Sequence, residues 1–187
     1  MPTDTRSRMI QATVEALQQH GVAGMSFTEV LHSSGAARGA IYHHFPGGKA
    51  QLVAEAATHN GNDVRAHLAA LPAKSPRGVV KGFLTAIRPV VRASTTGGGC
   101  AIAAVSVGAD RDDLRTVAAT AFDAWVDQLA ERLTAAGLPA KEATDLATTL
   151  ITLLEGAHVL CRAAGTLQPF DRAARTAIAL TQSRYPE

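Results

Sequence analysis

Glycine and proline residues divide this chain into segments whose apolar residues recur at helical spacing, and this punctuation limits the fold more than any other feature. In the first segment, Ile10, Val14 and Leu17 lie at i, i+4 and i+7, and Gly21 ends the pattern. The chain is 47% hydrophobic but only 4% aromatic, and its apolar share is largely alanine, which favours helix over strand. We therefore predict an all-α fold. The breaks that follow predict helices near residues 27–34, 37–45, 49–71, 77–95, 101–109, 111–136, 140–164 and 170–184.

Two short helices joined by a glycine turn are predicted between residues 26 and 45. Ser26 and Glu29 have the S-x-x-E spacing of a capping box, in which each side chain bonds a free backbone amide of the first turn. Gly35 then breaks the pattern before a third segment begins. Helices of this length in this order are typical of a helix-turn-helix.

Three kinds of chemical site can be weighed against that interpretation. A phosphate-binding loop needs a glycine where His43 stands and a hydroxyl where Ala50 stands. A metal site needs converging ligands, whereas His43 and His44 are neighbours about 100° apart on a helix. Nucleophilic catalysis needs a base and an acid beside a serine, and Ser33 and Ser34 have only the neighbourhood of a helix end. We therefore expect no metal, no cofactor and no enzymatic activity.

In a helix-turn-helix, the second helix enters the DNA major groove. Arg38 at its start can pair with guanine, and the small Gly39 and Ala40 permit close approach to the bases. Lys49 opens the next helix, where its ammonium and free backbone amides can hold a phosphate. The alternative is that Tyr42 and the histidines only cover a small core. The predicted DNA-binding residues are Ser26, Thr28, Arg38, Gly39, Ala40, Tyr42, His43 and Lys49.

The bulk properties fit a cytoplasmic protein and add little about its partner. The formal net charge is +2, and residues 1–50 contain four Lys or Arg against three Asp or Glu, which is little support for a polyanion. Cys100 and Cys161 are isolated, so neither a disulfide framework nor a zinc knuckle is expected. The polar N-terminus has no signal-peptide core, and we expect no membrane insertion.

Residues 26–53, SFTEVLHSSGAARGAIYHHFPGGKAQLV, resemble the signature of the TetR family of transcriptional regulators. The match rests on Ser26, Val30, Gly35, Gly39, Ile41, Tyr42, His44, Phe45, Lys49 and Leu52. The resemblance covers residues 5–55, and it implies a repressor that binds a palindromic operator as a homodimer and is released by a small molecule. The FPGGK turn, one residue longer than usual, and GCAIAAV at residues 99–105 resemble an LmrA/YxaF-like subgroup.

The stretch departs from the family pattern just before the recognition helix. Ala36-Ala37 replaces the usual V-S, so the serine cap and its phosphate contact are missing, which is a loss of about 1 kcal/mol of capping. We expect these contacts to shift to Arg38.

The segment at 140–164 is apolar around much of its circumference, so one face is expected to pack in its own bundle and another against a partner. The last segment repeats small residues that suit close helix packing. Together they predict a four-helix dimer interface. The residues predicted for it are Leu150, Leu153, Ala157, Leu160, Ala174, Ala177 and Ile178.

Large, soft or polar side chains inside the apolar segments are candidates to line an effector pocket, although each can also be plain core. Trp125 and His158 are favoured, because a buried indole N–H or imidazole needs a partner that a ligand can supply. The full set is Phe83, Ile87, Val91, Cys100, Phe122, Trp125, Leu154, His158 and Phe170.

The sequence thus predicts an N-terminal three-helix DNA-binding domain with a helix-turn-helix over residues 1–48, then a helical-bundle ligand-binding and dimerisation domain over residues 49–187. The predicted partners are double-stranded DNA with a palindromic operator, a small apolar or aromatic effector and a second copy of the chain. Two alternatives remain open: a small helical enzyme or ligand carrier that does not bind DNA, and a purely structural dimerisation bundle.

Overall fold

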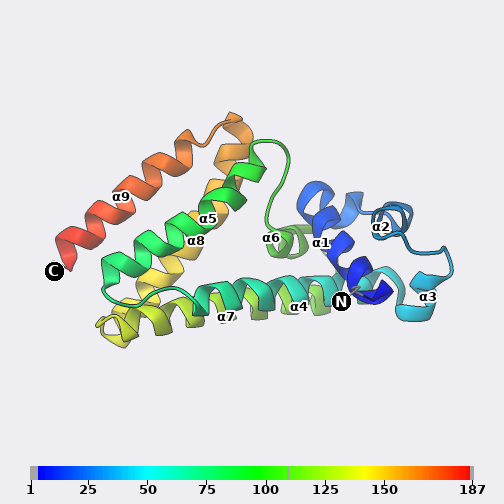
Figure 1. Cartoon of the computed structure of the whole chain (residues 1–187), viewed down its shortest axis with the longest axis horizontal. Coiled ribbons are helices and arrows are strands. Elements are labelled where there is room, and N and C mark those ends of the chain that lie inside the picture. Colours follow the sequence, from blue (N-terminus) through cyan, green and yellow to red (C-terminus); the bar gives the residue numbers. More distant parts are fainter. Residues whose placement is uncertain (1–3, 109, 186–187) are drawn as a thin grey trace. The chain divides into compact units, whose positions relative to one another are not determined.

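The computed structural model describes residues 4–108 and 110–185. Within these residues the chain forms nine helices and no β-strand (Figure 1). The helices are α1 (Thr5–Gly24), α2 (Phe27–Ser34), α3 (Ala40–His44), α4 (Gly48–Ala69), α5 (Pro76–Ser94), α6 (Ala101–Gly108), α7 (Asp112–Ala135), α8 (Ala140–Ala164) and α9 (Gln168–Arg184). The all-α prediction is confirmed.

Most helix boundaries lie within two residues of the glycine and proline breaks that predict them. Two helices differ: α1 continues to Gly24 through a kink at Gly21, whose φ of 67° is left-handed, and α3 is shorter than predicted. The predicted end of α6 at residue 109 lies outside the described residues.

The helices belong to two compact units. The first unit takes the chain up to Asn62 together with Cys100–Ala121, and the second takes Asp63–Gly99 and the chain from Phe122 onward. Helix α4 therefore contributes its first part to one unit and its last part to the other, and α7 is divided in the same way.

The first unit is built around α1, which packs against both α2 and α6. Met9, Leu17 and Val30 are among its fully buried side chains, and Ile41 and Phe45 add the inner face of α3 to the same unit. Burial of such side chains is the main force that holds these short helices in place.

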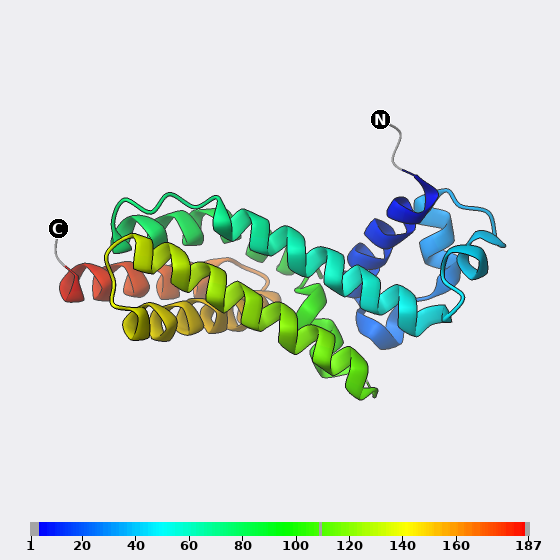
Figure 2. The same cartoon turned by 90° about the horizontal axis from the view of Figure 1, so that it is seen from below.

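In the second unit α5, α8 and α9 pack against one another, and Figure 2 shows α8 and α9 side by side. Ser75 caps α5 by accepting a hydrogen bond from the Gly78 amide at 3.1 Å. An ion pair of 2.9 Å between Arg88 and Asp171 joins α5 to α9. By length and composition alone α8 could cross a membrane, but a core helix of a soluble protein passes the same test.

Candidate functional site

Helix α2 begins and ends as the sequence predicts. Ser26 accepts a hydrogen bond from the Glu29 amide at 3.2 Å, which confirms the serine half of the capping box. The Glu29 carboxylate contacts His20 Nε2 at 2.9 Å, so it joins α2 to α1. The helix ends at Gly35, which has the left-handed φ of 65°.

Helix α3 holds three of the predicted recognition residues, Ala40, Tyr42 and His43, whereas Arg38 and Gly39 lie in the turn that precedes it. It begins only at Ala40 because no side chain caps it, as expected where alanines replace the usual serine. Ile41 and Phe45 are buried on its inner face, whereas Tyr42 is 68% exposed and touches Phe27 edge-on with ring centroids 6.2 Å apart. The helix therefore has one anchored face and one open face.

The predicted DNA-binding residues lie at or near the protein surface. Ser26, Thr28, Arg38, Gly39, Tyr42 and His43 are exposed, and Ala40 and Lys49 are half-buried. Arg38 has no ion pair or hydrogen bond to the described part of the chain, so its guanidinium is available to an outside acceptor. The assignment of these residues to DNA stays a prediction.

Lys49 makes a contact that the sequence does not reveal. Its Nζ donates a hydrogen bond of 2.8 Å to the backbone oxygen of Met25, one of the two residues between α1 and α2. An ammonium has three donors, so a phosphate contact is still possible beside this bond. Lys49 thus fixes the start of α4 to the helix-turn-helix.

Two arginines of α1 also hold the helix-turn-helix, and sequence reasoning missed both. Arg6 pairs with Glu55 of α4, and its guanidinium lies over the Phe45 ring at 5.2 Å from the centroid. Arg8 Nε donates to the Ser34 backbone oxygen at 2.9 Å. The partners in these contacts are far apart in the sequence, so the periodic spacing of apolar residues along the chain does not predict them.

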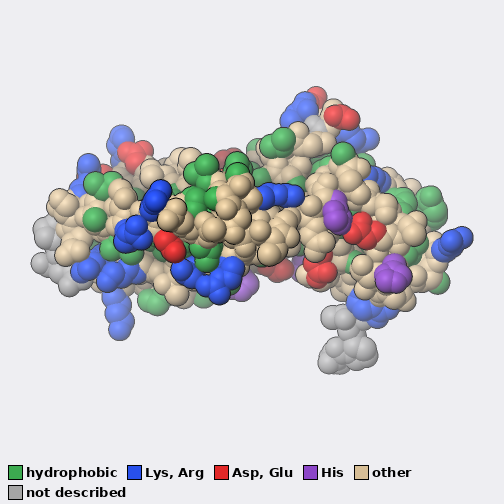
Figure 3. Space-filling model, turned by 90° about the horizontal axis from the view of Figure 1, so that it is seen from above, with side chains coloured by type: hydrophobic (Ala, Val, Ile, Leu, Met, Phe, Trp, Pro, Cys, Tyr) green, Lys and Arg blue, Asp and Glu red, His purple; other side chains and the backbone are tan. Residues whose placement is uncertain are grey.

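The charge of this region is balanced. Residues 1–62 contain four Lys or Arg and four Asp or Glu. Figure 3 shows such a mixed surface, with blue Lys and Arg beside red Asp and Glu and purple His. Binding to a phosphate backbone here depends on a few placed contacts and backbone amides rather than on a general positive field.

The residues predicted to line a pocket are mostly core. Of the nine, Cys100 belongs to the first unit and the other eight to the second. Phe122 is half-buried and meets Trp125 edge-on at 5.3 Å, while Trp125 is only 1% exposed. The others, all buried, are Phe83, Ile87, Val91, Leu154, His158 and Phe170.

A buried polar pair lies within the second unit. Ser94 Oγ and His158 Nδ1 are 2.6 Å apart, which joins the end of α5 to α8. Burial lowers the pKa of His158 from 6.5 to about 4, so the imidazole is neutral at neutral pH. Sequence reasoning chose His158 for its polarity among apolar residues and missed Ser94.

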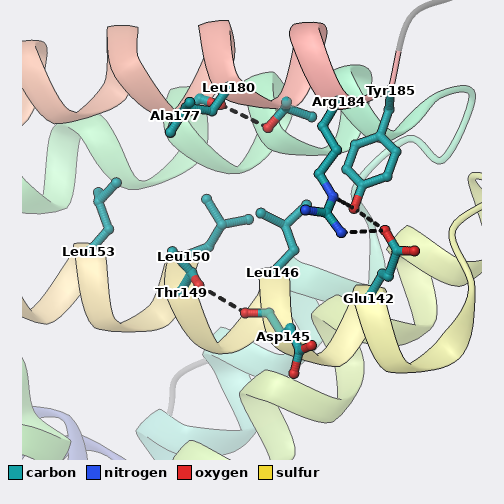
Figure 4. Close-up of a pocket in the computed structure, with 11 residues that line it drawn as sticks. Glu142, Asp145, Leu146, Thr149, Leu150, Leu153, Ala177, Leu180, Arg184 and Tyr185 are labelled. Atoms are coloured by element: carbon teal, nitrogen blue, oxygen red, sulfur yellow. Dashed lines mark hydrogen bonds and ion pairs between the residues drawn. The ribbon is translucent and has the colours of Figure 1, made fainter.

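A groove of about 270 Å³ lies between α8 and α9, away from the predicted pocket residues (Figure 4). At one end, Glu142 accepts hydrogen bonds from Tyr185 at 2.5 Å and Arg184 at 3.3 Å. The bond from Tyr185 lowers the pKa of Glu142, and burial followed by this bond raises the pKa of Tyr185. The remaining lining residues are Asp145, Leu146, Thr149, Leu150, Leu153, Ala177, Leu180 and Thr181.

The residues predicted for the dimer interface differ in how exposed they are in the single chain, and their assignment to an interface stays a prediction. Leu150 and Ala157 are buried within the single chain, although Leu150 also lines the groove between α8 and α9. Leu160 is 58% exposed and Leu153 is half-buried. Ala174, Ala177 and Ile178 of α9 are also half-buried. Two other apolar residues of these helices are exposed, Val159 (67%) in α8 and Leu180 (65%) in α9.

Comparison with known proteins decides the family. Residues 9–56 match the family "Bacterial regulatory proteins, tetR family", and residues 76–176 match "Transcriptional regulator LmrA/YxaF-like, C-terminal domain". The chain belongs to the TetR family of transcriptional regulators. It is accordingly a helix-turn-helix DNA-binding regulator, and the resemblance to the LmrA/YxaF-like subgroup is confirmed.

Relatives within the TetR family align over nearly the whole chain. The HTH-type transcriptional regulator Rv0196 of Mycobacterium tuberculosis is 35% identical over 97% of this chain and 96% of its own. LmrA of Bacillus subtilis is 25% identical over 89% and 90%. A TetR regulator structure from Legionella pneumophila has the same fold, with a TM-score of 0.82 at 22% identity over 97% of this chain and 99% of its own.

Proposed function

We propose that this TetR regulator is a repressor that binds a palindromic operator as a homodimer. The observation that carries the proposal is α3, whose inner face is buried through Ile41 and Phe45 and whose outer face is open. In this proposal residues 1–48 form the DNA-binding domain, residues 49–187 form the ligand-binding and dimerisation domain, and the protein acts in the cytoplasm without a cofactor or a membrane.

The proposed DNA contacts divide into two kinds. Arg38, which is exposed, reads a base edge from the turn just before α3, with Gly39 and Ala40 allowing close approach. Lys49 and the hydroxyl groups of Ser26, Thr28 and Tyr42 contact phosphates and fix the register, and His43 lies beside them. The first kind gives sequence preference and the second gives affinity.

We further propose that an apolar or aromatic effector releases the DNA. The second unit supplies large buried side chains for such a ligand, with Trp125 and the neutral His158 as the polar handles. For release, the effector must bind the conformation that does not hold DNA more tightly, and operator DNA must then weaken effector binding by the same factor.

The test is to titrate the protein into labelled duplexes taken from the DNA that flanks the gene. Binding is measured by fluorescence anisotropy at several salt concentrations. Tight binding to one inverted repeat, with an affinity that falls as salt rises, supports the proposal. Equal binding to the inverted repeat and to random DNA refutes operator recognition. No binding to any duplex favours a helical ligand-binding protein or enzyme instead.

A further inference from the structure

The turn that joins α3 to α4 (Figure 1) is shaped around one side chain of α4. A Cβ built on Gly47 in this turn would lie 3.0 Å from Cβ and 3.0 Å from Oε1 of Gln51. Any other residue at position 47 would therefore crowd Gln51. The glycine and the glutamine belong together as one local arrangement.

Gln51 holds the turn through both ends of its amide group. Its Oε1 accepts a hydrogen bond from the Gly47 backbone amide at 2.8 Å. Its Nε2 donates to Glu55 Oε1 at 2.9 Å, one helical turn further along α4. Because an ionised carboxylate can only accept hydrogen bonds, Glu55 fixes the Gln51 amide with its oxygen toward Gly47.

Arg6 of α1 extends these contacts to the other end of the turn. Its guanidinium pairs with Oε2 of Glu55 and lies over the ring of Phe45, the residue that follows α3. The contacts thus run from Phe45 through Arg6 and Glu55 to Gln51, and all of these residues lie in the first unit. We call Arg6, Gln51 and Glu55 the turn clamp.

The turn clamp leaves backbone amides open at the start of α4. The Gly47 amide is used by the clamp, and the Gly48 amide donates to the carbonyl oxygen three residues earlier at 2.9 Å. Among the described residues, none accepts a hydrogen bond from the backbone amides of Lys49 and Ala50. Free amides in the first turn of a helix bind phosphate, and the helix dipole adds to the attraction.

We propose that Gln51 is a positioning residue for the DNA phosphate contact at the start of α4, and that Arg6 keeps Glu55 from repelling that phosphate. The inference rests on the phosphate contact proposed above for Lys49. Gln51 fixes the direction of the α4 amides by holding the turn, and Glu55 orients Gln51. The Glu55 carboxylate is one helical turn away from Gln51 and would repel a nearby phosphate, but its pairing with Arg6 neutralises the charge.

Replacing Gln51 with methionine in the full chain tests the positioning role. Methionine has a similar length but cannot accept a hydrogen bond from the Gly47 amide in the same way. We expect the affinity for an operator duplex and for a random duplex to fall by the same factor, about fivefold for each recognition unit, since a phosphate contact carries no sequence information. A loss confined to the operator duplex would contradict a role at the phosphate.

Gln11 offers a matched control for this substitution. Its Nε2 donates to Glu15 Oε1 at 3.1 Å with the same four-residue spacing, on an exposed part of α1. Gln11→Met should bind both duplexes as the native chain does. Binding is measured well below the melting temperature of each variant, so that a loss of stability alone does not change it.

A charge cycle tests Arg6 and leaves the hydrogen bond to the turn in place. Arg6→Ala should weaken binding to both duplexes, because it leaves the Glu55 carboxylate unpaired near the phosphate. Adding Glu55→Gln should restore most of the affinity, since a glutamine at this position still accepts the bond from Gln51 but carries no charge. If Arg6 instead contacts DNA itself, Glu55→Gln restores nothing. This cycle decides the inference if Gln51→Met does not fold.

The outcomes separate this inference from the proposed function. If Lys49→Ala behaves as the loss of a phosphate contact while Gln51→Met and Arg6→Ala bind DNA like the native chain, the positioning role is overturned and the phosphate contact stands. A lower melting temperature of Gln51→Met with unchanged DNA affinity also overturns it, because the turn clamp then only stabilises the fold. If Lys49→Ala leaves the salt dependence unchanged, the phosphate contact is wrong and the inference falls with it.

Discussion

Replacing Lys49 with alanine separates two roles that one ammonium is proposed to hold. Within the chain, Lys49 Nζ donates to the Met25 carbonyl at 2.8 Å and so joins α4 to the α1–α2 connection. Toward DNA, the same group is proposed to contact a phosphate. The first role affects stability and the second affects the salt dependence of binding, so two measurements distinguish them.

The magnitude of each effect follows from the geometry. A hydrogen bond from a charged donor contributes about 1.5–3 kcal/mol when buried, and exposure to solvent reduces this to about 1 kcal/mol for the half-buried Lys49. The melting temperature of Lys49→Ala should then fall by about 2–4 °C. Loss of one phosphate contact flattens the plot of log affinity against log salt by about 0.9 for each half-site, hence about 1.8 for a homodimer.

The assay is anisotropy with an operator duplex and a random duplex between low and moderate salt, beside a thermal melt of each protein. Lys81→Ala is the control, because it removes the same charge from an exposed position on α5 in the second unit. We expect Lys49→Ala to weaken binding to both duplexes by a similar factor, and Lys81→Ala to leave both affinities unchanged. A lower melting temperature with an unchanged salt slope would show that Lys49 is only a structural tie, and a loss confined to one operator sequence would contradict a phosphate contact.

Four further predictions concern recognition, pH, the buried polar pair and the effector. Arg38→Ala should cost about 1–3 kcal/mol at one base position of each half-site in competition assays, and an equal loss on random DNA would make Arg38 a backbone contact. The pKa of His158 is about 4 in the folded chain and 6.5 in the unfolded chain, so protonation favours unfolding below pH 6.5. The free energy of unfolding should therefore fall by up to about 3 kcal/mol as the pH falls from 6.5 to 4. Urea titrations of His158→Phe should show no such fall. Ser94→Ala should lower the melting temperature by removing the partner of that imidazole, and an unchanged value would mean that the bond contributes nothing. An aromatic effector should quench Trp125, the only tryptophan, and release the operator. Trp125→Phe should bind DNA normally and be released less readily by the effector. If the variant instead binds DNA much more weakly, and the effector still releases the remaining complex normally, Trp125 has a purely structural role.

The glycine and proline residues at the helix ends made most of the fold predictable from sequence. A proline or glycine ends a helix through its own backbone, so the limits of α5, α8 and α9 could be read from neighbouring residues. Helix α3 was predicted three residues too early, because its apolar spacing continues back through alanines that have no side chain to cap a helix. Spacing shows which residues share a face, but not where the first turn closes.

Which face of α8 packs inside the chain was harder to predict, because α8 is apolar on two sides. Leu150 and Leu153 lie on adjacent faces of the helix and are equally suited to burial, so composition cannot tell which one meets the chain's own bundle. Only the positions of α5 and α9 decide that Leu150 is core. The same limit applies to Lys49 and Met25, whose contact depends on where α4 begins in space.

The balanced charge of residues 1–62 makes the proposed dimer a condition of DNA binding. The helix-turn-helix of one chain offers few free cations to DNA, since Arg6 is paired with Glu55 and Lys49 already bonds a backbone oxygen. With few phosphate contacts, a single recognition unit binds weakly, and joining two units raises affinity by making the second contact intramolecular. Loss of the proposed dimer contact would therefore reduce operator affinity by far more than any single DNA-facing substitution. In such a regulator, an effector need not touch a DNA-contacting residue, because a change in how the two copies are held is enough to release the operator.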